Sequence, residues 1–175
     1  MTHERLTELL KGVSFSADLP DETLRKLARI SRVRSFPAGA ILVEEGTHNN
    51  DVYLIWSGRV ALDVQVPGHG NVRILSLSPG DVVAWSALLE LGEMTASAVA
   101  TEDTETVAFP ADQLLRECQK DHEVGYEIMR RMARQLARRL LATRCQLADL
   151  IAREPASSSP CDSPQAEPPT LQSAR

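Results

Sequence analysis

The segment Val60-Ala61-Leu62-Asp63-Val64-Gln65-Val66, followed by Pro67-Gly68-His69-Gly70 and then by Asn71-Val72-Arg73-Ile74-Leu75, decides the fold class. Two runs of β-branched and other apolar residues flank a short segment with one proline and two glycines, which is the pattern of a β-hairpin. Glycine is favoured in such turns because it adopts positive φ without a steric penalty. The sequence therefore predicts antiparallel strands here.

The same pattern continues on both sides of this hairpin. Short apolar runs separated by glycines predict eight strands: Val33–Phe36, Ile41–Val43, Val52–Trp56, Val60–Val66, Val72–Leu77, Val82–Trp85, Ala96–Ala100 and Thr106–Phe109. The breaks fall at Gly39, Gly46, Gly58, Gly68, Gly70, Gly80 and Gly92. Many short strands with regularly spaced turns are typical of an antiparallel barrel or jelly roll.

Helices are predicted on both sides of this roll, which makes the expected fold class α+β. Apolar residues at helical spacing indicate a short helix over residues 3–11 and a second helix with Pro20 in its first turn and Asp18 or Ser16 as its cap. After the last strand, a short helix is expected over Ala111–Gln119 and a long one over residues 125–153. The N-terminal helices and the long C-terminal helix should therefore flank a β-roll or jelly roll.

The long helix exceeds what one small roll can cover. At about 1.5 Å per residue it spans about 45 Å. Its apolar residues recur at steps of three or four, close to a coiled-coil seam: Met129, Met132, Leu136, Leu140, Thr143, Leu147 and Leu150. We expect a second copy to cover this seam in a homodimer. The alternative is a helix packed lengthwise along its own domain.

Positive charge is concentrated on this helix. The net charge of the chain is −5, yet residues 125–154 hold seven arginines and three acidic residues, so the remainder carries −9. An acidic chain argues against general nucleic-acid binding. Arginines on a long helix most often lie on its outer face, exposed to solvent. The alternative is that they contact an anionic ligand or a polyanion.

Composition divides the chain into residues 1–154, one domain that includes the long helix, and residues 155–175, a Pro/Ser-rich tail that we expect to be disordered because it cannot bury enough apolar surface. No run approaches the roughly 18 consecutive apolar residues of a membrane span. The three cysteines, Cys118, Cys145 and Cys161, do not suggest a disulfide framework, and Cys118 and Cys145 are expected to be small buried residues.

Because neither a disulfide framework nor a membrane span is predicted, we expect a cytoplasmic protein without a membrane partner.

Neither a catalytic centre nor a metal site is expected. The histidines, His3, His48, His69 and His122, lie in separate segments, so the metal ligands of a cupin-type β-roll are missing. No nucleophile elbow, phosphate-binding P-loop or paired-carboxylate motif occurs. The sequence thus predicts a protein that is not an enzyme.

Four segments, taken in order, resemble the cyclic-nucleotide-binding domain family. Phe36-Pro37-Ala38-Gly39 through Gly46 resembles its opening strands, Tyr53-Leu54-Ile55-Trp56-Ser57-Gly58-Arg59-Val60 its first hairpin, and Leu77-Ser78-Pro79-Gly80-Asp81-Val82 through Leu88 the start of its phosphate-binding cassette. Gln135–Thr143 resembles the dimer helix of the bacterial catabolite activators. The resemblance covers about residues 15–152 and implies a β-roll with flanking helices, dimerised through the long helix.

The resemblance also implies a ligand site. In the family, backbone amides, a glutamate and an arginine of the cassette hold the cyclic phosphate and the ribose, and two residues of the long helix reach the base. Carried onto this sequence, the site comprises Gly80, Asp81, Val82, Trp85, Met94, Thr95, Ala96, Ser97, Arg139 and Thr143. The favoured alternative is structural: Arg139 is solvated or pairs across the dimer, and Thr143 is a small residue of the seam.

Two departures weaken this site. Asp81 stands where the family has the glutamate, and Met94 stands where it has the phosphate-binding arginine. A lost charge-assisted hydrogen bond costs about 1.5–3 kcal/mol, so we expect cAMP and cGMP to bind with dissociation constants of tens of micromolar or worse.

Two functions remain. The first is a stand-alone regulatory domain that senses a cyclic nucleotide or another small anionic ligand, with no fixed cofactor. The second is a ligand-free dimer that acts as a structural or protein-interaction module. No sequence-specific DNA binding is expected, because the family's winged helix-turn-helix has no counterpart in residues 155–175. An open pocket between Gly80 and Ser97 favours the first function, and a pocket filled by Met94, Trp85 and Leu89 favours the second.

Overall fold

The computed structural model describes residues 2–89 and 93–153. The helices are α1 (His3–Lys11), α2 (Asp21–Ile30), α3 (Ala111–Lys120) and α4 (His122–Arg153), with a short 3₁₀ helix η1 (Trp85–Ala87). The strands are β1 (Arg32–Phe36), β2 (Ile41–Val43), β3 (Asp51–Ser57), β4 (Val60–Val66), β5 (Gly70–Leu77), β6 (Val82–Val83), β7 (Ser97–Ala100) and β8 (Thr104–Pro110). The predicted tail, residues 155–175 with Cys161, lies outside the described residues.

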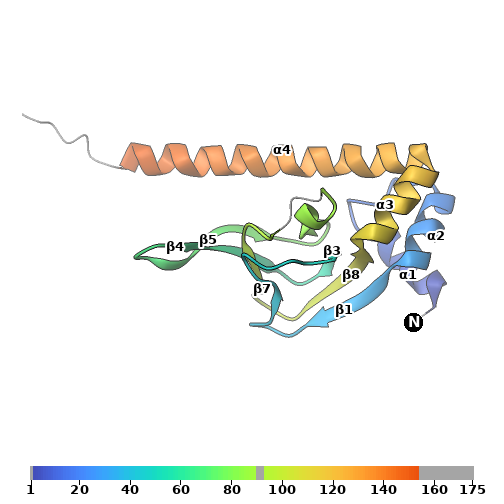
Figure 1. The fold of residues 1–175 in the computed structure, drawn as a ribbon, viewed down its shortest axis with the longest axis horizontal. Helices are drawn as coiled ribbons and strands as arrows, with labels where there is room; N and C mark the ends of the chain where they lie inside the picture. Colours follow the sequence, from blue (N-terminus) through green and yellow to red (C-terminus); the bar gives the residue numbers. More distant parts are fainter. Residues whose placement is uncertain (1, 90–92, 154–175) are drawn as a thin grey trace, which may run out of the picture.

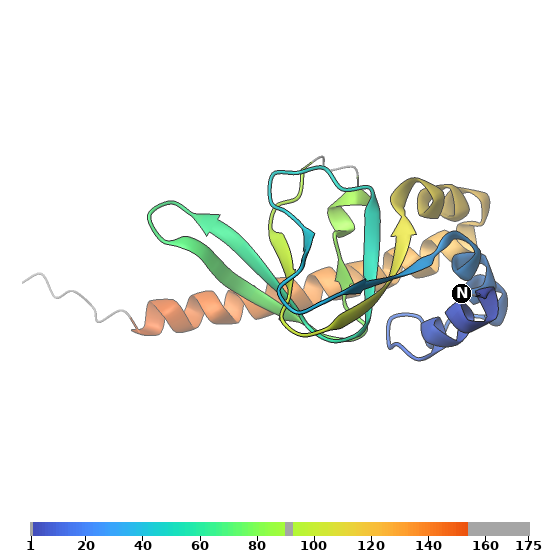
Figure 2. The same cartoon turned by 90° about the horizontal axis from the view of Figure 1, so that it is seen from below.

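The strands form two antiparallel four-stranded sheets, in the orders β1-β8-β3-β6 and β2-β7-β4-β5. They curve around a common interior, and the β4–β5 hairpin projects from one end of the roll (Figure 2). All eight predicted strands are confirmed. The strand predicted over Val82–Trp85 is shorter, because the backbone at Ala84 turns into the left-handed region (φ 60°) and leads into η1.

Both N-terminal helices are confirmed, but the predicted cap of α2 is wrong. Pro20 occupies the N-cap position, and no side chain caps the helix. Ser16 is instead buried, with its hydroxyl donating to the Leu10 carbonyl oxygen. Asp18 lies beside α4 in the loop between α1 and α2.

Helix α4 begins three residues earlier than predicted. The Asp121 carboxylate caps it by accepting hydrogen bonds from the amides of Glu123 (3.1 Å) and Val124 (3.2 Å). Gly125 therefore lies inside the helix, where a Cβ would come within 2.7 Å of the Cys118 carbonyl oxygen. The glycine allows α3 and α4 to approach closely.

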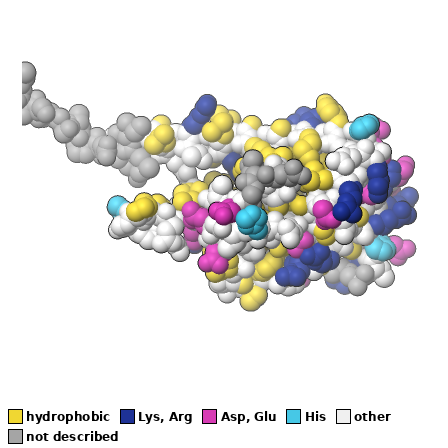
Figure 3. Space-filling view, viewed as in Figure 1, with side chains coloured by type: hydrophobic (Ala, Val, Ile, Leu, Met, Phe, Trp, Pro, Cys, Tyr) yellow, Lys and Arg dark blue, Asp and Glu magenta, His cyan; other side chains and the backbone are white. Residues whose placement is uncertain are grey.

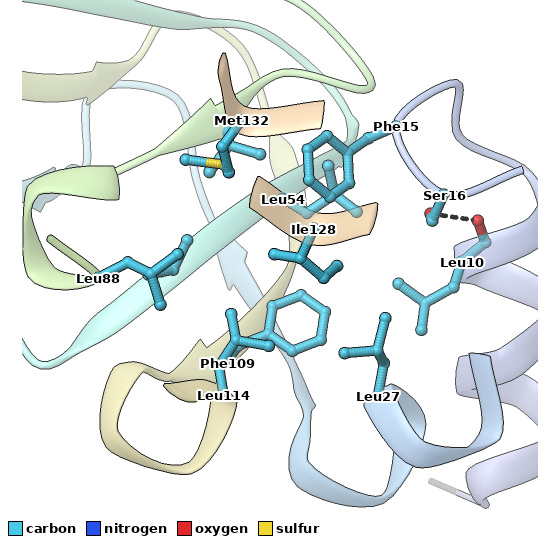
Figure 4. A pocket seen from close by; sticks show the side chains of 12 residues that line it. Leu10, Phe15, Ser16, Leu27, Leu54, Leu88, Phe109, Leu114, Ile128 and Met132 are labelled. Carbon is cyan, nitrogen blue, oxygen red and sulfur yellow. Dashed lines mark hydrogen bonds between the residues drawn. The ribbon is translucent and has the colours of Figure 1, made fainter. Parts of the chain in front are cut away.

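The main core lies between the helices and the roll. Leu10, Leu27, Leu54, Phe109 and Ile128 point toward one another from α1, α2, β3, β8 and α4 (Figure 4). They leave an apolar cavity of about 20 Å³, room for little more than one water molecule. A second cluster, centred on Ile55, Val60 and Ala98, fills the interior of the roll. The first half of α4 is thus part of the main core.

Helix α4 runs the length of the molecule beside the roll and extends past it, toward the end from which the hairpin projects (Figure 1). Burial changes along it: Val124, Ile128 and Met132 are buried, whereas Leu140 and Leu147 are exposed. Among the described residues, no helix is long and apolar enough to cross a membrane.

The structure corrects the predicted seam at Met132, which faces the core and is only 5% exposed. The outward face instead carries Tyr126, Met129, Ala133, Leu136, Leu140, Thr143 and Leu147, all at least partly exposed, at alternating steps of three and four. Hydrophobic side chains accordingly appear at intervals along α4 in the space-filling view (Figure 3). The outward face is a regular heptad stripe, which the predicted seam was not.

The two cysteines in the described part of the chain differ. Cys118 is half-buried beside Gly125, and burial raises the pKa of its thiol. Cys145 is exposed on α4, so its predicted burial is wrong. The physical reason is that the roll does not cover this half of the helix.

Candidate ligand pocket

The turn between β5 and β6 is held by its own backbone and by Asp81. Gly80 has φ 91°, and a Cβ there would clash with the Ser14 hydroxyl, so this position favours glycine. The Gly80 amide donates to the Ile55 carbonyl oxygen (2.8 Å). The Asp81 carboxylate accepts from the Ser78 amide (2.9 Å) and so closes the turn.

Ala84 follows with an unusual backbone. Its φ of 60° and ψ of 34° lie in the left-handed region, which costs a residue with a Cβ about 1–2 kcal/mol. Such strain concentrates at functional sites, where the surrounding structure holds it in place. Here it turns the chain from β6 into η1, which forms one wall of a pocket.

That pocket lies between the roll and α4. The residues that line it come from β2, β4, β6, η1, the approach to β7 and α4: Val43, Leu62, Val83, Ala84, Trp85, Ser86, Met94, Thr95, Ala96 and Arg139. Its volume is about 40 Å³, whereas small-molecule sites typically have about 300–1,000 Å³. A ligand of nucleotide size therefore needs the walls of the pocket to move.

Met94 forms one of these walls. Its side chain is 3% exposed, and its sulfur accepts a hydrogen bond from the Ser86 hydroxyl (3.3 Å). Its backbone exchanges hydrogen bonds with the segment after β2: the Met94 amide donates to Thr47, and the Gly46 amide donates to Met94, each at 2.8 Å. Met94 is thus fixed by its backbone and sits in the pocket as an apolar residue.

Arg139 supplies the positive charge of the pocket. Its guanidinium donates to the Val82 carbonyl oxygen, while its Nε is buried without a hydrogen-bond partner among the described residues. Burial lowers the pKa of Arg139, and the Asp81 carboxylate partly offsets this effect. An arginine remains charged at neutral pH under such shifts. The pocket therefore contains a partly desolvated cation that lacks a full set of acceptors.

Gln135, one helical turn before Arg139, joins α4 to the same turn. Its Oε1 accepts from the Val82 amide (3.0 Å), and its Nε2 donates to the Gly80 carbonyl oxygen (2.6 Å). Together with Arg139 it makes three hydrogen bonds from α4 to residues 80–82. Sequence reasoning missed this residue, and the only available signal was its i, i+4 spacing from Arg139.

Comparison with known proteins identifies this arrangement. The family model described as the cyclic nucleotide-binding domain matches residues 33–121, about half of the chain. The chain belongs to the cyclic nucleotide-binding domain family.

Relatives and solved structures agree with this assignment. The chain is similar to the cyclic AMP receptor protein of Thermus thermophilus, with 33% identity over 117 residues that make up 67% of this chain and 54% of that protein. It is also similar to a CRP-like cAMP-activated global transcriptional regulator of Mycobacterium tuberculosis, with 27% identity over 146 residues, 83% of this chain and 63% of that one. The chain thus aligns with somewhat over half the length of these curated relatives.

A solved structure supports the fold independently. A cyclic nucleotide-binding domain from Methylobacillus flagellatus superposes with a TM-score of 0.73 at 20% identity, covering 85% of this chain and 83% of that chain. At this identity the likeness concerns the fold alone. It agrees with the predicted β-roll, flanking helices and long C-terminal helix.

Within this cyclic nucleotide-binding domain, half of the ten predicted site residues line the pocket: Trp85, Met94, Thr95, Ala96 and Arg139. Gly80, Asp81 and Val82 form the adjoining turn, where the Asp81 carboxylate accepts a hydrogen bond from the Ser78 amide.

The last two predicted residues are engaged elsewhere. The Ser97 hydroxyl accepts from the Glu45 amide (3.0 Å). Thr143 is exposed beyond the pocket, with its hydroxyl donating to the Arg139 carbonyl oxygen (2.9 Å). The structure thus brings Arg139 to the cassette but leaves Thr143 outside it.

The pocket is neither fully open nor fully filled. Met94 and Trp85 take up part of the space, whereas Leu89 is 42% exposed and does not line the pocket. In the part of the chain that the structure describes, no cluster of three or more His, Cys, Asp or Glu side chains could hold a metal ion. Among the described residues that line the pocket, Arg139 is the only one with a charged side chain.

Proposed function

We propose that this domain is a regulatory module that senses a small anionic ligand of the cyclic nucleotide class, bound between the cassette and α4. One observation carries the proposal: the Arg139 guanidinium lines the pocket with a buried, unpaired Nε among the described residues. A buried polar group without a partner destabilises a fold by about 1–3 kcal/mol, and more if charged. An anion in the pocket would remove that cost.

The affinity for cyclic nucleotides should be modest. Met94 gives the cassette no cation, so only Arg139 offers a charge-assisted hydrogen bond among the described residues of the pocket. The small volume adds the cost of moving η1 or Trp85 to admit the ligand. Dissociation constants of tens of micromolar or worse for cAMP and cGMP follow from these two effects together.

In this proposal, ligand binding is transmitted as a change in the position of α4. Gln135 and Arg139 bind the turn at residues 80–82, so a ligand that draws Arg139 toward itself changes how the helix is held. Beyond these residues, the outward heptad stripe of α4 suits a second copy of the chain in a homodimer.

The test begins with the native protein. Mass spectrometry of small molecules released on denaturation is expected to find an anionic ligand. Calorimetric titration with cAMP and with adenosine, which lacks the phosphate, then tests the role of Arg139. The natural chain should prefer cAMP, R139Q should lose that preference, and R138Q on the exposed face should keep it. Equal binding of cAMP by the natural chain and R139Q would contradict the proposal.

A second candidate, a ligand-free interaction dimer, is favoured by the small pocket and by the burial of Met94. It predicts no released small molecule and no binding of either nucleotide or nucleoside. It also predicts that M94R gains no affinity for cAMP, because no binding mode exists to be completed. The sensor proposal predicts tighter binding by M94R, by about 1.5–3 kcal/mol. Asp81 is best left unchanged in this test because its carboxylate holds the turn.

A further inference from the structure

We propose a second anion site in this protein: a cleft between α4 and the loop that joins α1 to α2, in which Arg131, Arg134 and Arg138 bind a phosphate dianion, either free or as part of a small phosphomonoester. This cleft lies outside the cassette pocket, and the inference does not depend on the proposed function.

The cleft is formed by two segments that are far apart in the sequence. Its described lining residues come from the loop and from α4: Ser14, Phe15, Asp18, Arg131, Arg134, Gln135 and Arg138. The loop is anchored to the main core beside α4, where Phe15 and Ile128 point into the same apolar cavity (Figure 4). The volume of the cleft is about 180 Å³, against about 40 Å³ for the cassette pocket. Because sites for larger organic ligands have roughly 300–1,000 Å³, the cleft suits a small ion or a compact phosphorylated molecule.

Positive charge prevails in this cleft. Arg131, Arg134 and Arg138 are three and four residues apart, so they lie along one face of α4. Asp18 is the only acidic residue among the described lining residues. Within the described chain, no salt bridge involves Asp18, Arg134 or Arg138. The arginines therefore repel one another, and an anion held between them converts this repulsion into attraction.

Arg131 gives the cleft a fixed, buried donor. Its side chain is held by the Phe15 carbonyl oxygen, to which it donates at 3.0 Å, and the residue is only 9% exposed. The Glu127 carboxylate lies 3.4 Å from Arg131 but 2.6 Å from Arg130, so it neutralises Arg131 only in part. The Nε of Arg131 is buried without a hydrogen-bond partner among the described residues. The planar guanidinium group matches the geometry of phosphate oxygens, which accept such charge-assisted hydrogen bonds.

The cleft uses a face of α4 that a second copy of the chain does not need. With Leu140 of the heptad stripe at position a, Arg134 occupies position b, and Arg131 and Arg138 occupy position f. Positions b and f lie away from the a and d positions that form a coiled-coil seam. The site is therefore complete within one chain and stays open in the proposed homodimer.

The shape of the site favours a small anion over a nucleic-acid backbone. Arg134 and Arg138 are exposed at the rim, whereas Arg131 lies at depth behind them. A polyanion lying along the helix would meet the two exposed arginines but not the buried one. The net charge of −5 further disfavours binding of the whole chain to nucleic acid.

The test is calorimetric titration with inorganic phosphate at a mildly alkaline pH, against chloride at equal ionic strength. The natural chain should bind phosphate, and R134Q and R138Q should each weaken binding about tenfold or more, because each removes a charge-assisted hydrogen bond. R144Q removes the same charge from an exposed position of the same helix outside the cleft and should bind as the natural chain does. D18N should bind more tightly, because it removes the carboxylate that repels phosphate. Arg131 is left unchanged because it holds the Phe15 carbonyl oxygen.

Two further comparisons separate this site from the cassette pocket and its possible occupants from each other. R139Q should keep phosphate binding while losing the preference for cAMP over adenosine, and R138Q should do the reverse. Glycerol 3-phosphate, with glycerol as its control, distinguishes a phosphomonoester from free phosphate by which of the two binds more tightly. No phosphate binding by the natural chain, equal binding by R138Q, or an equal loss in R144Q would overturn the inference without touching the proposed function. Binding of duplex DNA in place of phosphate would also overturn it, because the arginines would then serve a polyanion.

Discussion

The two halves of α4 share one unbroken helix but differ in what covers them. In the first half, Val124, Ile128 and Met132 are at most 5% exposed and belong to the main core. In the second half, Leu140, Leu141 and Leu147 are each more than half exposed. Both halves are rich in apolar and basic residues, so their difference comes from the reach of the roll and not from composition. The first half stabilises the monomer, and the second is available to a partner.

The boundary between the halves coincides with the pocket. Among the described side chains of α4, those of Gln135 and Arg139 are the last with hydrogen bonds to the roll, and both bind the turn at residues 80–82. A change in these hydrogen bonds therefore affects how both halves of the helix are held. The comparison teaches that one helix can divide its length between packing against its own roll and a face left exposed, with a pocket where the two meet.

The largest expected effect comes from shortening a buried side chain in the first half. I128A should lower the free energy of unfolding by about 2–5 kcal/mol, because it removes contacts and leaves a cavity. L147A in the second half is the control, with a loss below about 0.5 kcal/mol. Chemical denaturation at a protein concentration that favours the monomer measures both. Similar losses in the two variants would show that the halves are not distinct.

Charge on the seam should have the next largest effect. L140E places two carboxylates against each other at position a and should weaken the dimer by roughly 2–3 kcal/mol or abolish it. L141E is a close match, because Leu141 is 60% exposed against 54% for Leu140 but lies off the stripe. Sedimentation should find twice the 19.2 kDa chain mass for L141E and the monomer for L140E. If L141E dissociated the dimer as well, the heptad assignment would be wrong.

Substitutions of Gln135 test the hydrogen bonds at the boundary between the two halves. Q135A leaves the Val82 amide and the Gly80 carbonyl oxygen without their partner and should destabilise the fold by about 1–3 kcal/mol. Q135E keeps the acceptor for Val82 but sets a carboxylate oxygen against the Gly80 carbonyl oxygen, so its loss should be at least as large. Hydrogen exchange should show faster exchange at residues 80–82 in Q135A. Unchanged exchange there would mean that this side chain does not hold the turn.

The smallest expected effect concerns the strained backbone of the pocket wall. A84G should raise the free energy of unfolding by about 0.5–1 kcal/mol, because glycine relieves the left-handed conformation but gains freedom in the unfolded chain. Thermal unfolding of the two chains at equal concentration checks the sign. A lower melting temperature for A84G would show that the alanine methyl group contributes more by packing than it costs in strain.

Much of the fold followed from the sequence because glycine marks the turns. The VALDVQV–PGHG–NVRIL hairpin and the glycines around it located every strand of the roll, although residues 90–92, with Gly92, lie outside the described part. The direction faced by each α4 residue was harder to predict. Met129 and Met132 lie three positions apart, on adjoining parts of one helix face, and only the position of the roll decides that Met132 is buried.

The pocket was predicted less completely than the fold. The resemblance pointed to Arg139, which the structure places beside Met94 in the pocket wall. It did not reveal that Asp81 and Ser97 use their side chains to hold local backbone. Gln135 escaped notice because a polar residue on a helix carries no sequence signal until its acceptor is known. Hydrogen bonds between distant segments depend on tertiary geometry, which residue spacing does not encode.

Hydrogen exchange along α4 at two protein concentrations tests the division of this helix most directly. At a concentration well below the dimer dissociation constant, amides of residues 124–139 should be protected and those of residues 140–149 should exchange rapidly. At a concentration well above it, protection should spread through residues 140–149 and change little in the first half. Protection of the second half that does not depend on concentration, or its absence at every concentration, would contradict the account.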